Sequence, residues 1–203
     1  MTHLFLVRHG ESQWNADRRL QGQADIPLSE YGREQSLAIA GTLRALGPER
    51  VVASDLVRVR ETADLLGYPD HEVTELLREI DVGAWTGRSI DDLLAEDPAA
   101  YQGWRAGRFT PPDGESWAHF KERTGRVVAD LWRDTPGRVL VVAHGGVIRA
   151  VLENLLGLKP EQIVPAGPGS LTTLRLGKPN GRDDVRLEVF NYTPLAPAFD
   201  PAD

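Results

Sequence analysis

The chain has 203 residues, enough for one domain with a well-buried core, and its lack of cysteine excludes disulfides, thiolate metal sites and cysteine nucleophiles. The net charge of −7 argues against binding to nucleic acids or membrane surfaces, and no apolar run approaches the roughly 20 residues of a membrane span. Because Met1-Thr2-His3 leads directly into a predicted strand and leaves no room for a signal peptide, we expect a cytoplasmic protein.

Short apolar runs that suit buried strands alternate with helical patterns along the chain. In chain order, we expect the following elements: a strand at Leu4–Val7, a helix capped by Ser29 and ended by Gly47-Pro48, a strand at Val51–Ala53, a helix capped by Ser54 or Asp55 that runs to Leu66, an extended segment at Val73–Leu77, a helix within Glu115 to Asp134, a strand at Arg138–Ala143, a helix at Val147–Leu156, and strands near Ser170–Leu176 and Val185–Tyr192. This alternation, closed by a strand pair, predicts a three-layer α/β/α sandwich with a mostly parallel central sheet.

One segment, residues 88–117, departs from this alternation. It contains two short helical pieces, Ile90–Glu96 and Ala99–Ala106, and it is interrupted by proline and glycine. Such a segment is typical of a cap over the mouth of a pocket. Residues 194–203 form a Pro-rich tail that we expect to be loose. With no internal repeat and no long linker, residues 1–203 are expected to form a single domain.

Two of the predicted strands end in the same dipeptide. Arg8-His9-Gly10 follows the first strand, and His144-Gly145-Gly146 follows the strand at Arg138–Ala143. In open α/β sheets, ligands bind at the carboxyl ends of the strands. If these two strands are parallel neighbours, the imidazoles of His9 and His144 lie side by side at such a site.

Five sequence blocks, in order, resemble those of the histidine phosphatase superfamily, which also contains the cofactor-dependent phosphoglycerate mutases. They are Arg8-His9-Gly10-Glu11-Ser12 with Trp14-Asn15, Leu20-Gln21-Gly22 with Pro27–Gly32, Ser54–Arg58 with Glu61-Thr62-Ala63, Leu77-Arg78-Glu79 with Gly83–Gly87, and Val142–Gly146. They span roughly residues 3 to 156. The resemblance implies a phosphoglycerate mutase-like fold, and the block Gly83–Gly87 is similar to the phosphatase branch.

The resemblance implies that His9 is a nucleophile that forms a phosphohistidine. Arg8 and Arg58 beside it would disfavour protonation of the imidazole and keep it nucleophilic. Together with His144, these arginines would surround the phosphoryl oxygens as positively charged donors and stabilise the transferring group.

Further phosphate contacts are implied by the same resemblance. Asn15 and Gln21 would supply uncharged contacts, although capping of the loop is an alternative role for both. Gly22 belongs to the same block. Gly145 and Gly146 open a predicted helix, so that backbone N–H groups and the helix dipole face the phosphate.

Glu79 matches the general acid of the family, which protonates the leaving alkoxide. A carboxyl group beside a dianionic phosphate would have its pKa raised toward the working range. Asp81 is a competitor, because it lies on the same face as Glu79 if the segment is extended. Thr86 stands where many members carry Glu, which removes a further candidate acid.

The residues together favour a phosphomonoester hydrolase that acts on a small phosphorylated metabolite, with no cofactor and no metal. A phosphoglycerate mutase is the main alternative, but it would need an enclosing lid and cations for two phosphates, whereas segment 88–117 is short. A non-catalytic phosphate-binding protein is the third possibility, although such a protein has no use for the acid.

Four side chains of the cap could line the pocket: Trp104, Arg105, Arg108 and Trp117. Neither the physiological substrate nor the oligomeric state is indicated.

Overall fold

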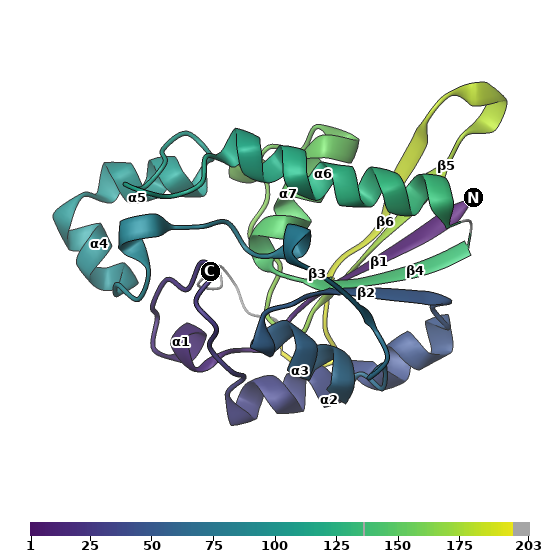
Figure 1. Cartoon of the computed structure of the whole chain (residues 1–203), viewed down its shortest axis with the longest axis horizontal. Coiled ribbons are helices and arrows are strands. Elements are labelled where there is room, and N and C mark those ends of the chain that lie inside the picture. The colour runs from purple at the N-terminus through teal and green to yellow at the C-terminus, as the bar shows by residue number, and fades with distance from the viewer. Residues whose placement is uncertain (136, 197–203) are drawn as a thin grey trace.

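The computed structural model describes residues 1–135 and 137–196. Its centre is a six-stranded sheet with the strand order β3-β2-β4-β1-β5-β6 (Figure 1). The strands are β1 (Thr2–Arg8), β2 (Arg50–Ser54), β3 (Glu72–Thr74), β4 (Gly137–Ala143), β5 (Leu171–Gly177) and β6 (Asp184–Tyr192). The four strands from β3 to β1 pair in parallel, while β5 pairs antiparallel with both β1 and β6. The expectation of a mostly parallel sheet is confirmed.

Helices cover both faces of this sheet. The α-helices are α1 (Gln13–Ala16), α2 (Glu30–Leu46), α3 (Val57–Leu65), α4 (Ile90–Glu96), α5 (Pro98–Arg105), α6 (Trp117–Asp134) and α7 (Gly145–Leu156), and the 3₁₀ turns are η1 (Glu75–Leu77), η2 (Gly83–Trp85), η3 (Pro160–Gln162) and η4 (Pro179–Gly181). Helices α2 and α3 lie on one face, and α6 and α7 lie on the other (Figure 1). The predicted three-layer sandwich is confirmed.

Alternating side chains of β1 divide the apolar core into two parts. Leu4 and Leu6 pack into the cluster that contains the buried residues of α6 and α7. Phe5 and Val7 point to the opposite face and pack against α2 and α3. A parallel strand buried on both faces needs this continuous apolar run, and each fully buried side chain contributes about 1.5–3 kcal/mol.

The ends of helix α2 follow from its sequence. Ser29 has extended backbone angles and its hydroxyl accepts a hydrogen bond from the Gly32 N–H, as expected of an N-cap. Gly47 adopts the left-handed conformation, with φ of 60°, and its N–H donates to the carbonyl of Leu43. The predicted bounds of this helix are confirmed.

The predicted cap of helix α3 is wrong. Its N-cap is Leu56, which has no side-chain capping bond. The hydroxyl of Ser54 instead lies 3.1 Å from Nε2 of His144, and the carboxylate of Asp55 pairs with Arg78. Both polar side chains make contacts with segments distant in the sequence, and capping rules consider only neighbouring residues.

The extended segment predicted at Val73–Leu77 is only partly correct. Strand β3 ends at Thr74, whose hydroxyl accepts a bond from the Leu76 N–H and caps the turn η1. The chain then continues without regular structure from Arg78 to Val82. Glu79 therefore lies in an irregular segment whose position depends on contacts with other elements.

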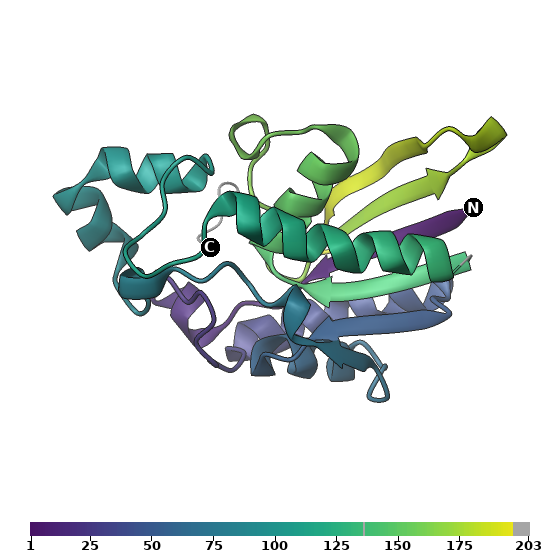
Figure 2. The same cartoon turned by 45° about the horizontal axis from the view of Figure 1, so that its top comes forward.

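Segment 88–117 contains α4 and α5, close to the bounds expected for its two helical pieces. Both helices lie beyond the carboxyl ends of β1 and β4, on the opposite side of the molecule from the chain's N-terminus (Figure 2). No helix in the described part of the chain is long and apolar enough to cross a membrane. Most of the tail predicted to be loose, residues 197–203, lies outside the described residues.

Candidate active site

Parallel pairing of β1 with β4 brings the two His-Gly sequences together. Arg8 lies opposite Ala143 in the register, so His9 and His144 leave the sheet at the same level. The His9 N–H donates to the carbonyl of Ala143 at 2.9 Å. The two imidazole centroids lie 5.2 Å apart, with ring planes inclined at 68°. The predicted adjacency of the two imidazoles is confirmed.

The hydrogen bond of His9 determines which ring nitrogen is available. Nδ1 lies 2.6 Å from the carbonyl oxygen of Gly10. Because a carbonyl can only accept, Nδ1 carries the proton and Nε2 carries the lone pair. Burial, and then the charges of Arg58 and Arg8, hold the pKa of His9 well below its usual range. His9 is therefore a neutral imidazole at physiological pH.

His144 is also neutral, which differs from the positively charged donor that we expected. Its Nδ1 faces a guanidinium nitrogen of Arg58 at 3.4 Å, and a guanidinium can only donate. Nε2 therefore carries the proton and donates to the hydroxyl of Ser54 at 3.1 Å. Burial holds the pKa of His144 well below its usual range, and the charges of Arg58 and Arg8 are further causes.

Backbone carbonyls hold the two arginines of the site. Arg58 donates to the carbonyls of Ala24 and Gly22 at 2.7 and 2.9 Å, and Arg8 donates to Ala166 at 2.7 Å. Burial lowers the pKa of Arg58 to about 10, so it remains protonated at neutral pH. These cations are fixed before any anion binds, and such preorganised charge stabilises developing negative charge effectively.

The two glycines after His144 leave room for charged side chains. A Cβ on Gly145 would lie 3.2 Å from Nη1 of Arg8, and a Cβ on Gly146 would lie 2.9 Å from Cδ of Glu79. Oε2 of Glu79 accepts from the Gly146 N–H at 2.9 Å, and Oε1 accepts from the Ile80 N–H at 2.8 Å. The Gly146 N–H, at the start of α7, is thus bonded to Glu79 and does not face the phosphate site as expected.

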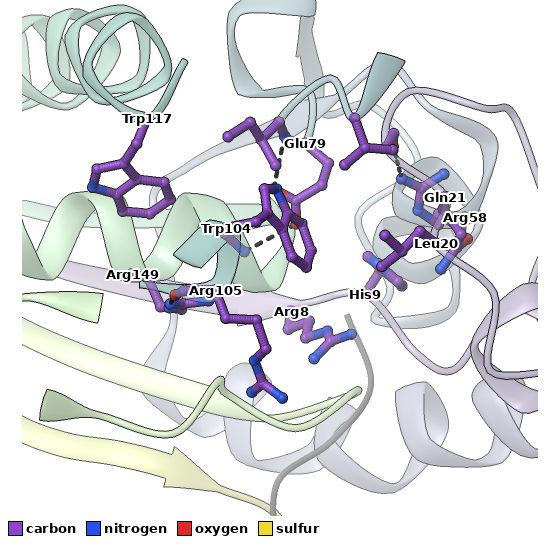
Figure 3. Close-up of a pocket in the computed structure, with 14 residues that line it drawn as sticks. Arg8, His9, Leu20, Gln21, Arg58, Glu79, Trp104, Arg105, Trp117 and Arg149 are labelled. Carbon is purple, nitrogen blue, oxygen red and sulfur yellow. Dashed lines mark hydrogen bonds between the residues drawn. The ribbon is translucent and has the colours of Figure 1, made fainter. Parts of the chain in front are cut away.

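Glu79, and not Asp81, lines the cavity beside His9, whereas His144 and Gly145 are buried behind it and are not among its lining residues. The cavity is narrow, with about 30 Å³ open to the centre of a water molecule, and it is lined at one end by His9, Arg8, Arg58 and Glu79 (Figure 3). Asp81 is not among its lining residues, and Oδ1 of Asp81 accepts from the Gly83 N–H at 2.9 Å.

The cap provides the other end of the cavity. Trp104, Arg105 and Trp117 line it, as their positions in the sequence suggested. Arg108 does not, because its side chain is exposed and pairs with Glu161. The cavity wall is therefore aromatic and basic on the side away from His9.

Of the expected uncharged contacts, the structure places Gln21 and Gly22 at the cavity but not Asn15. Asn15 forms a reciprocal capping pair with Ser12: its Oδ1 accepts from the Ser12 N–H, and its own N–H donates to the Ser12 hydroxyl, both at 3.1 Å. The Ser12 hydroxyl also contacts Oε1 of Gln21 at 2.6 Å. Asn15 thus has the capping role that we had considered as its alternative.

Sequence reasoning missed Arg149, which lines the cavity from α7. Its side chain is buried, donates to the carbonyl of Arg105, and lies with its guanidinium 5.7 Å from the ring of Trp117. The available signal was a lone cation in an otherwise apolar helical run, four residues after Gly145 and thus on the same helix face.

Comparisons with known proteins agree with this geometry. The model of the histidine phosphatase superfamily (branch 1) matches residues 4–187. A probable phosphoglycerate mutase, GpmB, of Salmonella arizonae is 37% identical over 170 residues, which cover 78% of this chain and 76% of that protein.

Solved structures are similar over almost the whole chain. A mycobacterial glucosyl-3-phosphoglycerate phosphatase, in complex with VO3, has a TM-score of 0.85 and 35% identity, covering 93% of this chain and 98% of that one. The alpha-ribazole phosphatase of Shigella flexneri has a TM-score of 0.79 and 28% identity, covering 94% and 96% of the two chains. The chain therefore belongs to the histidine phosphatase superfamily, and the resemblance seen in its sequence is confirmed.

Proposed function

We propose that this protein is a phosphomonoester hydrolase that works through a phosphohistidine on His9. The observation that carries the proposal is the state of His9: a neutral imidazole, bonded through Nδ1 to Gly10, beside Arg8, Arg58 and Glu79 in one cavity. A lone pair on Nε2 is what attack on phosphorus requires. The phosphatase neighbours at 35% and 28% identity support hydrolysis as the outcome.

The first step transfers the phosphoryl group to the protein. Nε2 of His9 forms a bond to phosphorus as the ester P–O bond breaks, and Arg8 and Arg58 stabilise the phosphoryl oxygens. The departing alkoxide takes a proton from Glu79. A bound phosphate dianion offsets the cations around His144 and raises the pKa of this imidazole. His144 then takes a proton from solvent, donates a hydrogen bond to the phosphoryl group, and returns that proton to solvent when phosphate leaves.

The second step releases phosphate. Glu79, now a carboxylate, takes a proton from a water molecule as the water oxygen attacks phosphorus. The bond between phosphorus and Nε2 breaks, which restores the neutral imidazole. Glu79 therefore begins the cycle protonated, acts first as acid and then as base, and ends the cycle with a proton taken from water.

The substrate in this proposal is a small phosphorylated metabolite whose alcohol part extends toward the cap. Trp104 and Trp117 provide aromatic surface there, and Arg105 and Arg149 provide positive charge.

Residues 88–117 act as the cap of a single domain spanning residues 1–203. A cytoplasmic location belongs to the same proposal, and cell fractionation tests it.

Phosphate release from a panel of phosphomonoesters, measured without added metal, tests this function. We expect hydrolysis by the wild-type protein and none by His9→Ala. Release that is absent from all esters, or equal in the two proteins, would refute the hydrolase. A non-catalytic phosphate-binding protein would bind phosphate and release none from any ester.

A phosphoglycerate mutase is the second candidate, favoured by the GpmB relatives and by the presence of Arg105 and Arg149 in the cavity. These extra cations weaken the charge argument made against a mutase from the sequence. The deciding assay supplies 3-phosphoglycerate with and without catalytic 2,3-bisphosphoglycerate and measures both products. Isomer formation that exceeds phosphate release and depends on the bisphosphate would favour the mutase.

A further inference from the structure

The segment that carries Glu79 has little regular structure of its own. Strand β3 contributes three residues at the edge of the sheet, and after the turn η1 the chain is irregular from residue 78 to 82. A general acid must be held within a fraction of an ångström to protonate a leaving oxygen. Contacts from another element must therefore fix this segment.

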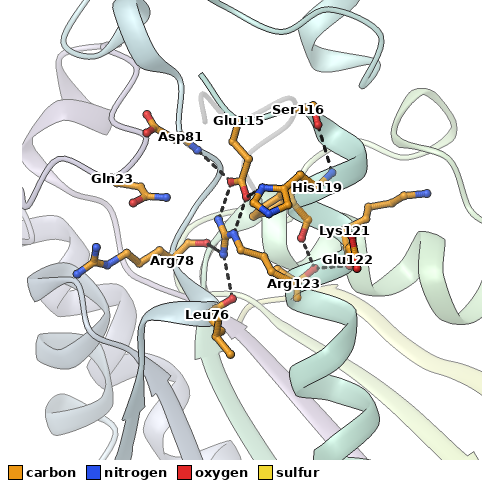
Figure 4. A network of polar contacts seen from close by, with 12 residues as sticks. Gln23, Leu76, Arg78, Asp81, Glu115, Ser116, His119, Lys121, Glu122 and Arg123 are labelled. Carbon is orange, nitrogen blue, oxygen red and sulfur yellow. Dashed lines mark hydrogen bonds and ion pairs between the residues drawn. The ribbon is translucent and has the colours of Figure 1, made fainter. Parts of the chain in front are cut away.

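Arg123, in the second turn of α6, makes those contacts. Its Nη1 donates to the carbonyls of Leu76 and Arg78 at 2.9 and 2.8 Å (Figure 4). Its Nη2 donates to the carbonyl of Glu79 itself at 2.9 Å. A single guanidinium thus binds three carbonyls within four consecutive residues and fixes the backbone from which the Glu79 side chain extends.

Glu115 holds Arg123 in turn. Nε of Arg123 donates to Oε1 of Glu115 at 2.7 Å and Nη2 donates to Oε2 at 2.8 Å, so the pair is bidentate. With the three carbonyl bonds, all five N–H groups that an arginine possesses are engaged. The side chains of Arg123 and Glu115 are only 12% and 9% exposed. The Glu115 N–H also donates to the carbonyl of Asp81 at 2.8 Å.

Glu79 is therefore fixed from two directions. Its backbone carbonyl is bound by Arg123 of α6, while its carboxylate is bound by the Gly146 N–H of α7. A flexible side chain on an irregular segment gains a defined position only when both ends are held. Arg123 does not line the cavity, so its direct contacts with the site run through Glu79. Its charge also contributes to lowering the pKa of His144, which makes Arg123→Lys, the variant that keeps the charge, the cleaner test of positioning.

We propose that Arg123, oriented by Glu115, is a positioning residue that holds the general acid Glu79 in place. This inference rests on the proposed hydrolase and adds to it the device that aligns its acid. Disturbing Arg123 should therefore impair the reaction only where a leaving group needs a proton. The nitrophenolate of nitrophenyl phosphate leaves without a proton, whereas the alkoxide of an alkyl phosphate needs one.

The test compares Arg123→Lys and Arg123→Gln with wild type on glycerol phosphate and on nitrophenyl phosphate. Displacing the acid by about 1 Å should lower kcat on glycerol phosphate by about 10²-fold, with at most about a threefold loss on nitrophenyl phosphate. Lys keeps the charge and reaches some of the carbonyls, so this variant keeps the test usable if the Gln variant fails to fold. Arg126→Gln is the matched control, because Arg126 lies one turn later on α6 in an exposed pair with Glu122. It should match wild type on both esters.

A double-mutant cycle with Glu79→Gln separates positioning from general loss of structure. If Arg123 acts through Glu79, then Arg123→Lys in the Glu79→Gln background should change the glycerol phosphate rate by less than about twofold. Additive losses, or equal losses on both esters, would overturn the positioning role while leaving the hydrolase intact. No phosphate release by wild type from either ester would overturn the hydrolase, and the positioning role with it.

Discussion

Gly146→Ala isolates the contact between Glu79 and the first turn of α7. An added Cβ would lie 2.9 Å from Cδ of Glu79 and closer still to Oε1, distances that real Cβ contacts essentially never show. The carboxylate lies at the end of a flexible side chain and can move away. It must then shift by about 1 Å and lose its bond from the Gly146 N–H, so we expect about a 10²-fold lower kcat on alkyl phosphates.

The stability of the folded chain should fall by a limited amount, so that the variant remains folded. Loss of a hydrogen bond to a charged acceptor costs about 1.5–3 kcal/mol, and the better helix propensity of Ala returns up to about 1 kcal/mol. We therefore expect the free energy of unfolding to fall by no more than about 3 kcal/mol. Urea unfolding followed by circular dichroism measures this change on the same samples used for kinetics.

Gly41→Ala provides the matched control. Gly41 lies in α2, and a Cβ there would meet nothing within 4 Å. This variant should be more stable by about 0.5–1 kcal/mol and unchanged in activity. If Gly146→Ala leaves alkyl phosphate turnover intact, the position of the Glu79 carboxylate does not matter to the reaction. If the rates on alkyl and nitrophenyl phosphates fall equally, the start of α7 binds the phosphate, and the assignment of its N–H to the acid is refuted.

Three further outcomes follow from the state of the site. His9→Ala should abolish turnover with the fold retained, and rapid quenching without acid should place labelled phosphate on His9 in wild type; label on another residue contradicts the covalent step. The folded-state pKa values of His9 and His144 are lowered, so the unfolded chain binds more protons than the folded chain below pH 6.5. As the pH is lowered below 6.5, the free energy of unfolding should therefore fall by up to about 1.4 kcal/mol per pH unit for each histidine. Urea titrations at several pH values measure that slope, which should be shallower in His9→Ala; an unchanged slope contradicts the lowered pKa. Activity should survive a chelator and be blocked by vanadate, whereas loss that zinc or magnesium reverses would show that a metal is required.

Most of the framework follows from sequence signals, because those signals are local. Apolar runs set the strands, and Ser29 and Gly47 set the ends of α2 through side-chain and backbone preferences that operate within one turn. The paired His-Gly sequences indicated the site, since parallel neighbours end at the same edge of a sheet. These features depend on few contacts beyond the sequence around them.

The role of each polar side chain, in contrast, depends on contacts made in the folded state. Ser54 was expected to cap a helix but bonds to His144, 90 positions away, and Arg149 meets the cap only because α7 packs beneath it. The neutral state of His144 depends on burial beside Arg58, and the backbone carbonyl of Glu79 is bound by Arg123, 44 positions later. A polar group can bond to any donor or acceptor within about 3 Å in the folded state. The spacing of residues along the chain does not reveal which donors and acceptors these are.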